Sequence, residues 1–278
     1  METKEKIFFL KNELINWYKP NRRKFEWRNT NDPWKILLIE VISQQTQLER
    51  ANSYYEIFIK HFPTPKRMAE SSFSKVLKLW SGLGYNNRAR RLYDASKILA
   101  KTNFEDIKPD FDKLPGVGKY TKNALLSFAY GEKVITEDTH VKKIISRFFG
   151  IKDVAIFIEK NNDYLLKNVD SRELNQSFMD FGSAICTTKN PKCSICPLNE
   201  LCKKYFTKSS PLQSKFKGSN REVRGKIIKL LTSEGSATQN QIIKELKINK
   251  EKVEIALNGL IKDEVLNKSS NNNFEINS

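Results

Sequence analysis

The sequence contains no long hydrophobic run. A helix that crosses a membrane needs about 20 consecutive apolar residues, and no stretch of this 278-residue chain approaches that length. The first residues, METKEKIFFLKNE, carry too many charges for a secretory signal peptide. These two absences predict an intracellular protein that makes no contact with a membrane.

The sequence also lacks the glycine patterns of nucleotide-binding loops. Its glycine turn LPGVGKYT, residues 114–121, matches neither GxGxxG after a strand nor GxxxxGK followed by Ser or Thr. The preceding segment, PDFDK, is not an apolar strand. A glycine turn that runs into a helix can nevertheless hold a phosphate through its backbone N–H groups. The turn therefore predicts a phosphate contact and leaves the source of that phosphate open.

Acidic residues are few relative to basic ones. The chain has 49 Lys and Arg against 32 Asp and Glu, a formal net charge of +17. Such an excess favours a polyanionic partner, because phosphate contacts release counterions; a lysine-rich but merely solvated surface is the alternative. Residues 219–278 carry ten basic and eight acidic residues. The basic excess therefore belongs to residues 1–218.

Alternating strand patterns are scarce before the last dozen residues, and the helical period dominates. Ile7, Leu10, Leu14 and Trp17, for example, fall on one face of a first helix. We therefore expect residues 1–204 to be nearly all α-helical. The polar, breaker-rich segment 206–219 is typical of a linker.

Residues 220–278 predict a small C-terminal domain. Three helical segments are followed by a polar hairpin, which is the outline of a winged helix. Ser236 or Thr238 is the expected N-cap of the second helix, and Asn249 that of the third. With its nearly neutral charge, such a domain fits DNA binding and protein contacts equally well.

The chain has only four cysteines, and all of them fall within residues 186–202. Their spacing is Cys186-x6-Cys193-x2-Cys196-x5-Cys202. Zinc ribbons usually bring together two separated C-x-x-C pairs, and only one such pair is present. Four closely looped thiolates fit a cubane iron–sulfur cluster better than zinc or unliganded cysteines.

Together, LPGVGKYT, Asp138 and the cysteine spacing resemble the helix–hairpin–helix DNA glycosylases that carry an iron–sulfur loop. The resemblance runs from about residue 17 to residue 204. It implies a mainly α fold with a [4Fe–4S] cluster, and a turn whose Gly116 and Gly118 amides, with Lys119 nearby, hold a DNA phosphate. The implied organisation is a glycosylase domain at 1–205, with a six-helix region at about 27–136 and the iron–sulfur loop at 186–202, then the linker at 206–219 and the winged-helix-like domain at 220–278.

Two further segments resemble the adenine glycosylase branch, MutY. They are FEWRNTNDPWKILLIEVISQQTQ, residues 25–47, and WSGLGYNNRARRL, residues 80–92. The resemblance assigns DNA or the flipped nucleotide as the partner of Trp27, Arg28, Gln44, Gln45 and Tyr85. Bifunctional relatives carry a lysine where this chain has Tyr120. Without that amine no imine forms with the sugar, so a monofunctional enzyme is expected.

The candidate catalytic groups are two carboxyls. Glu40 lies inside ILLIEVI, where burial would raise its pKa and keep it protonated for a leaving purine; a solvent-facing glutamate is the alternative. Asp138 precedes THVKK and is expected to cap a helix. The resemblance makes it also the group that stabilises a cationic sugar, with Tyr120 assisting. Asp180 is either an acid of the pocket or an ordinary surface acid.

Other residues have competing interpretations. Arg88, Arg90 and Arg91 fit phosphate contacts or a solvated helix face. Tyr85 fits a wedge in the base stack or the core, and His140 fits a helix residue or a DNA contact.

The expected activity is removal of adenine mispaired with 8-oxoguanine or guanine from double-stranded DNA, by a monomer that leaves an abasic site. The chain departs from the MutY pattern in two ways: it has a predicted winged helix where a pyrophosphohydrolase-like domain is usual, and it reads DTH at 138–140. A thymine or uracil glycosylase acting opposite guanine is the alternative. A catalytically inert DNA-binding regulator or damage sensor is the third possibility.

Overall fold

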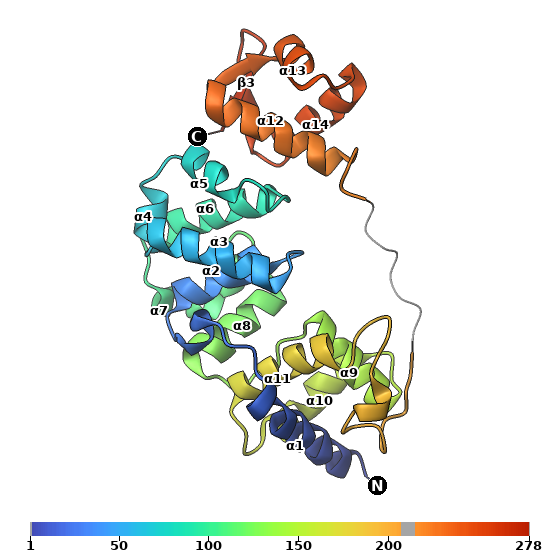
Figure 1. Ribbon diagram of the computed structural model, residues 1–278. Coiled ribbons are helices and arrows are strands. Elements are labelled where there is room, and N and C mark those ends of the chain that lie inside the picture. Colours follow the sequence, from blue (N-terminus) through green and yellow to red (C-terminus); the bar gives the residue numbers. More distant parts are fainter. Residues whose placement is uncertain (1, 207–214, 278) are drawn as a thin grey trace. The chain divides into compact units, whose positions relative to one another are not determined.

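The computed structural model describes residues 2–206 and 215–277, most of which are helical (Figure 1). These residues divide into two compact units, one formed by 2–36 with 117–206 and the other by 37–116 with 215–277. The predicted mainly α fold is confirmed. The boundary at residue 205 stays a prediction, and most of the predicted linker lies outside the described residues. Among the described helices, none combines the length and apolar character needed to cross a bilayer.

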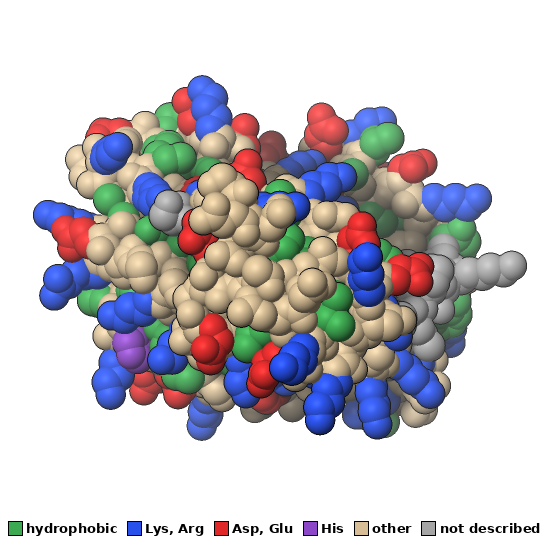
Figure 2. Space-filling view, turned by 90° about the horizontal axis from the view of Figure 1, so that it is seen from above, with side chains coloured by type: hydrophobic (Ala, Val, Ile, Leu, Met, Phe, Trp, Pro, Cys, Tyr) green, Lys and Arg blue, Asp and Glu red, His purple; other side chains and the backbone are tan. Residues whose placement is uncertain are grey.

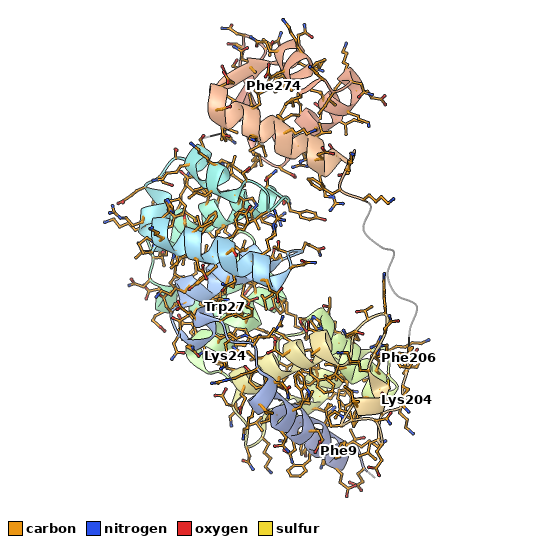
Figure 3. All side chains as sticks on the ribbon, viewed as in Figure 1. Phe9, Lys24, Trp27, Lys204, Phe206 and Phe274 are labelled. Carbon is orange, nitrogen blue, oxygen red and sulfur yellow. The ribbon has the colours of Figure 1, made fainter. Side chains whose placement is uncertain are left out.

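The first unit is built on α1, α9 and α11. Ile7, Leu10 and Leu14 of α1 are buried, as their spacing predicted, and Trp17 meets the ring of Phe181 edge-on at 5.2 Å. Figure 3 labels Phe9, which is also on α1. The unit comprises α1 (Thr3–Asn21), the 3-10 turn η1 (Glu26–Asn29), the start of α2 (Pro33–Ser43), α8 (Lys119–Tyr130), α9 (Thr139–Phe149), α10 (Val154–Leu166), α11 (Ser171–Ala184) and η3 (Cys193–Ile195).

Helix α2 is apolar on nearly all sides. Pro33 begins it, and the Asp32 carboxylate accepts hydrogen bonds from the backbone N–H groups of Trp34 and Lys35 at 2.9 and 3.3 Å. These contacts satisfy donors that a helix start leaves unpaired. The apolar side chains from Trp34 to Ile42 are all buried, so the helix is part of the core.

The N-terminal part of the second unit has an aromatic core. The rings of Phe58 and Trp80 meet edge-on at 5.6 Å, and those of Phe73 and Tyr93 stack at 5.2 Å. Its elements are the rest of α2, α3 (Leu48–His61), α4 (Pro65–Ala69), α5 (Phe73–Trp80), α6 (Asn87–Leu99), α7 (Phe104–Ile107) and η2 (Lys108–Lys113).

The C-terminal part of this unit has the element order of a winged helix. It contains α12 (Asn220–Glu234), β1 (Ser236–Thr238), α13 (Gln239–Leu246), α14 (Lys250–Lys262), β2 (Leu266–Lys268) and β3 (Asn273–Ile276). The strands form an antiparallel sheet in the order β1-β3-β2, and Phe274, labelled in Figure 3, lies on the central strand.

Two of the predicted helix caps in this part are confirmed. Thr238 caps α13 through a capping box, and Asn249 caps α14. The three-residue strand β1, which includes Thr238, was not predicted, because so short a strand has no readable alternation. In the view of Figure 2, basic side chains are spread over the visible surface with carboxylates between them.

Candidate active site

Asp138 is the N-cap of α9, as predicted. Its carboxylate accepts a hydrogen bond from the backbone N–H of Val141 at 2.6 Å. Burial raises the pKa of Asp138 above its ordinary value, although this hydrogen bond and the nearby charges of His140 and Lys143 pull the pKa down. The structure thus holds one carboxyl rigidly at a helix start, where the electropositive N-terminus also attracts it.

His140, two residues further on, packs against α11. A Cβ on Gly182 would lie 2.5 Å from its Nδ1, so only glycine fits at that contact. Lys143 donates to the carbonyl of Gly182 at 2.9 Å and lies 3.4 Å from His140 Nδ1. Burial lowers the pKa of His140. These contacts agree with the interpretation of His140 as a packed helix residue.

The glycine turn has the backbone that its sequence predicted. Gly116 adopts a left-handed conformation with φ +82°, and Gly118 is the N-cap of α8, where an added Cβ would meet nothing within 4 Å. Tyr120 lies in the first turn of α8 and is half-buried. Lys119 is exposed, and its ammonium pairs with the carboxylate of Glu137 at 2.6 Å. Sequence reasoning missed Glu137, whose carboxylate pairs with the lysine that was predicted to lie near the phosphate.

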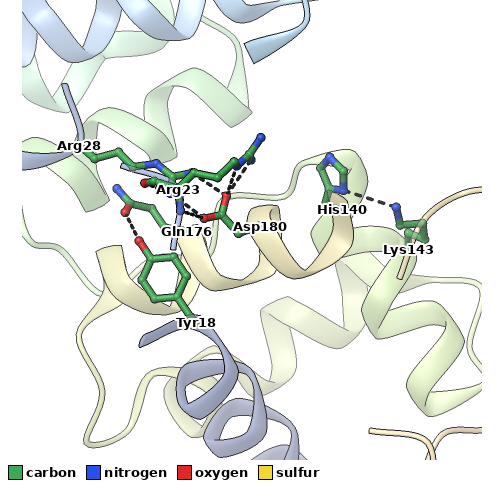
Figure 4. A network of polar contacts seen from close by, with 7 residues as sticks. All are labelled: Tyr18, Arg23, Arg28, His140, Lys143, Gln176 and Asp180. Carbon is green, nitrogen blue, oxygen red and sulfur yellow. Dashed lines mark hydrogen bonds and ion pairs between the residues drawn. The ribbon is translucent and has the colours of Figure 1, made fainter. Parts of the chain in front are cut away.

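Asp180 forms a buried ion-pair network with two arginines (Figure 4). Both oxygens of its carboxylate accept from the guanidinium of Arg28, at 2.7 and 2.8 Å, and Arg23 donates through Nε at 2.7 Å and through its backbone N–H at 3.0 Å. Burial opposes ionisation, but Arg28 and Arg23 outweigh it and lower the pKa of Asp180. Only 2% of Asp180 is exposed, so the surface-acid interpretation is wrong.

Trp27 lies beside this network. Its ring stacks on Phe25 at 5.3 Å, and the guanidinium of Arg28 lies 5.3 Å from the Trp27 ring. Within the described residues, Trp27 Nε1 is buried without a hydrogen-bond partner. A buried donor of this kind is costly unless a ligand or water accepts its hydrogen bond. Arg23, which the sequence did not single out, is marked there only by the basic run NRRK.

A polar hollow of about 680 Å³ borders the same network, within the size range of ligand pockets. Its lining contains five basic and three acidic side chains. The residues are Tyr18, Arg22, Arg23, Lys24, Phe25, Glu26, Arg28, Asn29, Asn31, Asp170, Arg172, Glu173 and Gln176.

Glu40 belongs to the second unit. It lies near the end of α2 and is 6% exposed, between Ile39 and Val41, which are also buried. The solvent-facing alternative is therefore wrong.

Gln45 and Tyr85 share an unusual backbone. Both adopt left-handed conformations, with φ +55° and +47°. Such angles are uncommon for residues other than glycine and cluster at functional sites. Gln45 is exposed, and Tyr85 is half-buried beside a hollow that Gln45 also lines. The core interpretation of Tyr85 is therefore wrong.

Arg88 requires a correction, because it faces neither solvent nor a phosphate. It is 6% exposed, and its guanidinium donates to backbone carbonyls of two chain segments. One segment is the end of α2, with Val41 and Ile42 at 3.0 Å and Gln44 close by; the other contains Leu83 and Gly84, both at 3.2 Å. Burial lowers the pKa of Arg88 to about 10, so it stays charged at neutral pH.

The other two arginines of α6 are nearer the surface. Arg90 pairs with Asp94 at 2.9 Å on the same helix. Arg91 is exposed and lies beside the glycine turn, where a Cβ on Gly116 would be 3.1 Å from its own Cβ.

The four cysteines, Cys186, Cys193, Cys196 and Cys202, line one small hollow in the first unit, and none forms a disulfide. Burial raises the pKa of Cys196 to about 11, so thiolates there need a positive centre. The donors around them suit a cluster: Arg147 donates to Cys186 Sγ at 3.3 Å, and the backbone N–H of Lys204 donates to Cys202 Sγ at 3.4 Å. These residues therefore fit an iron–sulfur cluster.

Arg147 also fixes the loop that carries the cysteines. Its guanidinium donates to the carbonyls of Thr187 and Thr188 at 2.7 and 3.0 Å and lies 4.8 Å from the ring of Phe206. Figure 3 labels Lys204 and Phe206 at this end of the chain segment. Because α9 carries Asp138 at its start and Arg147 near its end, one helix joins the candidate catalytic carboxyl to the cysteine loop.

Known proteins resemble this chain in sequence. The profile described as HhH-GPD superfamily base excision DNA repair protein matches residues 38–163, and that of the iron-sulfur binding domain of endonuclease III matches residues 186–202. The adenine DNA glycosylase of Mycobacterium tuberculosis (strain CDC 1551 / Oshkosh) is 30% identical over 78% of this chain and 77% of that protein. The prediction of an iron–sulfur cluster is confirmed.

The adenine DNA glycosylase of Buchnera aphidicola subsp. Baizongia pistaciae is 38% identical over 69% of this chain. The chain spans 57% of that relative and 65% of the one from subsp. Schizaphis graminum. Among solved structures, a thermostable thymine-DNA glycosylase has a TM-score of 0.67 at 26% identity, covering 73% of this chain and 98% of its own. A non-covalent endonuclease III–DNA complex has a TM-score of 0.62 at 25% identity, covering 74% and 97%.

Proposed function

The chain belongs to the adenine DNA glycosylase family, and from this premise we propose that it removes adenine mispaired with 8-oxoguanine or guanine from double-stranded DNA. The observation that carries the proposal is a pair of carboxyls in contrasting settings. Glu40 is buried near the end of α2, and Asp138 caps the start of α9. Two carboxyl groups with different environments are what cleavage of a glycosidic bond requires.

In the proposed reaction, Glu40 donates its proton to the flipped adenine as the bond between the base and C1′ breaks. The Asp138 carboxylate stabilises the positive charge that develops on the sugar. Water adds its hydroxide to C1′ and returns the remaining proton to Glu40. The products are free adenine and an abasic site.

The neighbouring residues fit supporting roles. Trp27 offers a ring and a buried Nε1 donor that has no hydrogen-bond partner among residues 2–206 and 215–277, and Arg28 is held in place by Asp180. Tyr120 in the first turn of α8 supplies no amine, so the proposed enzyme forms no imine with the sugar and is monofunctional. Cys186, Cys193, Cys196 and Cys202 would hold the [4Fe–4S] cluster, which would fix the fold of the cysteine loop, and no step of the reaction passes through it.

Thymine or uracil opposite guanine is the second candidate substrate. The structural similarity to a thymine-DNA glycosylase favours it, and Glu40, Asp138 and Tyr120 do not separate the two activities. The segment QQTQ at 44–47 and the turn GLGYN at 82–86 favour adenine. We further propose that the protein acts as a monomer.

A single-turnover assay on labelled duplexes, with alkali to cleave abasic sites, tests the proposal. The panel contains adenine opposite 8-oxoguanine, guanine and cytosine, with thymine and uracil opposite guanine. We expect excision of adenine opposite 8-oxoguanine and guanine. Excision of thymine or uracil alone would establish the second candidate. If the wild-type protein bound these duplexes without excising any base, it would be an inert regulator. We expect binding without excision only from the variants Glu40→Gln and Asp138→Asn.

A further inference from the structure

A hollow in the second unit lies where two helices begin. Its volume is about 190 Å³, well above the roughly 10–15 Å³ that one water molecule occupies on this measure. Asn86 and Asn87, the N-cap and first residue of α6, line it together with Asn220 and Arg221, the first two residues of α12. The starts of two helices from distant parts of the chain therefore share one hollow.

Both helix starts are open to an anion. The first N–H groups of a helix have no partner within it and carry partial positive charge. In the part of the chain that the structure describes, neither N-cap side chain, Asn86 nor Ser219, accepts a hydrogen bond from them. The Ser219 hydroxyl donates to the carbonyl of Phe216 at 2.6 Å, and Glu222, the acid in the first turn of α12, pairs with Lys226 at 2.9 Å. The helices are 13 and 15 residues long, so each start has its full partial charge.

The side chain of Asn86 points to a ligand. Asn86 is 7% exposed, and its amide has no hydrogen-bond partner within residues 2–206 and 215–277. Buried polar groups without a partner are rare, because their desolvation is costly. Asn86 lines this hollow and the neighbouring hollow of about 150 Å³, so the amide is open only toward these spaces. A molecule bound in the hollow can accept a hydrogen bond from the amide NH₂ group.

Two arginines of α12 supply positive charge. Arg221 and Arg224 both line the hollow and lie three residues apart, on one face of the helix. One acid, Asp263, lines it too, but its carboxylate pairs with Arg224. The guanidinium of Arg221 lies 6.0 Å from the centre of the Tyr85 ring, which also lines the hollow. The lining thus keeps a net positive charge in the form of a guanidinium, whose fork of donors matches the oxygens of a phosphate.

We propose that this hollow binds a phosphate group, held by the starts of α6 and α12, the amide of Asn86 and the guanidinium of Arg221. The inference goes beyond the proposed excision of adenine and does not depend on it. The phosphate belongs either to the backbone of DNA or to a small phosphate compound, and the experiment below distinguishes these sources. The C-terminal part, although nearly neutral as a whole, would supply one half of the site.

Two variants of the full-length protein alter the hollow. Asn86→Asp keeps the size of the side chain and a favourable helix start, but places a negative charge in the hollow. Its control is Asn249→Asp, the same change at the exposed N-cap of α14, which accepts from the backbone N–H of Lys252 at 3.0 Å. Arg221→Gln removes the guanidinium, and Lys229→Gln, at an exposed position of the same helix, removes a positive charge elsewhere.

The first measurement is the affinity for inorganic phosphate, by ³¹P NMR at an ionic strength held constant with chloride. We expect Arg221→Gln to weaken binding by about tenfold, the effect of losing a hydrogen bond to a charged group. Asn86→Asp should weaken it at least as much, because like charges repel at short range. The two controls should bind phosphate as the wild type does.

The second measurement is the affinity for an undamaged labelled duplex at several salt concentrations. A fall of about one in the slope of log affinity against log salt, in both hollow variants and neither control, identifies a DNA phosphate; it is a small part of the slope of a protein with about six phosphate contacts. Weakened phosphate binding with unchanged slopes identifies a small phosphate compound. Phosphate affinities and slopes that match the controls in both hollow variants would overturn the site. Neither measurement requires excision, so failure of the proposed function would leave this result intact.

Discussion

At the scale of single residues, Asp138 meets two opposing demands. The hydrogen bond from Val141 N–H favours its charged form, whereas burial disfavours that form and prevails, so the pKa is raised. A carboxylate with a raised pKa destabilises the folded state at any pH above that pKa, because the unfolded chain gives up the proton more readily. The carboxylate proposed to stabilise the sugar cation thus lowers the stability of the folded protein.

Asp138→Asn should separate catalysis from stability. Asparagine is as good an N-cap as aspartate, so we expect a free energy of unfolding at pH 7 equal to or above that of the wild type. Excision should fall by about 10²–10³-fold or more, because the stabilising charge is lost. The stability difference should shrink as the pH falls through the folded-state pKa of Asp138, where the wild-type carboxyl is neutral too. Urea unfolding at pH 5 and pH 7, with single-turnover rates, measures both effects.

Asp170→Asn is the matched control for that substitution. Asp170 caps α11 through the backbone N–H of Glu173 at 2.7 Å and is exposed. It should leave excision unchanged. Full excision by Asp138→Asn would contradict the assignment of Asp138.

At the scale of elements, Arg88 of α6 joins the end of α2 to the turn after α5. The last carbonyls of a helix have no partner within it. Here the Arg88 guanidinium donates hydrogen bonds to the carbonyls of Val41 and Ile42, and also to those of Leu83 and Gly84. The residues that follow these carbonyls are the strained Gln45 and Tyr85. We therefore regard Arg88 as the positioning residue for both.

Arg88→Lys should damage this arrangement. An ammonium group has three donors on one atom and cannot reproduce the fork of a guanidinium, so several buried carbonyls lose their partner. We expect a loss of about 2–4 kcal/mol in the free energy of unfolding and slower excision at saturating protein. Arg90→Lys is the control on the same helix, because its pair with Asp94 is local and should contribute at most about 1 kcal/mol. Equal losses in the free energy of unfolding and in the excision rate of the two variants would show that Arg88 does not position the segments of Gln45 and Tyr85.

The sequence predicted those elements whose signals are local. The caps at Asp138, Thr238 and Asn249 each act on a backbone group three residues away, and the buried face of α1 repeats with the helical period. Contacts between distant residues were beyond that reasoning. Asp180 meets Arg28 across 152 residues, and Arg88 reaches carbonyls up to 47 residues upstream. Whether Arg88 faces a phosphate or buried carbonyls, and whether Asp180 faces solvent or an ion pair, depends on such distant contacts, so the sequence did not predict either environment.

At the scale of the whole molecule, the net charge of +17 and its concentration in residues 1–218 predict how DNA binding responds to salt. A protein that makes about six phosphate contacts loses roughly 10³-fold in affinity between 50 and 200 mM salt. The C-terminal part, with ten basic and eight acidic residues, should contribute little to this slope.

Lys119 tests whether the glycine turn contributes to this salt dependence. In the free protein its ammonium already forms an ion pair with the Glu137 carboxylate at 2.6 Å. Lys119→Gln should reduce the slope of log affinity against log salt by about one if the turn holds a phosphate. Glu137→Gln should instead strengthen DNA binding, because Lys119 then no longer has to give up its ion pair with Glu137 in order to contact a DNA phosphate. Lys229→Gln, an exposed lysine of α12, is the control and should leave the slope unchanged. Titration of an undamaged labelled duplex at several salt concentrations gives all four slopes, and identical slopes for Lys119→Gln and the wild type would show that the turn binds DNA through its backbone amides alone.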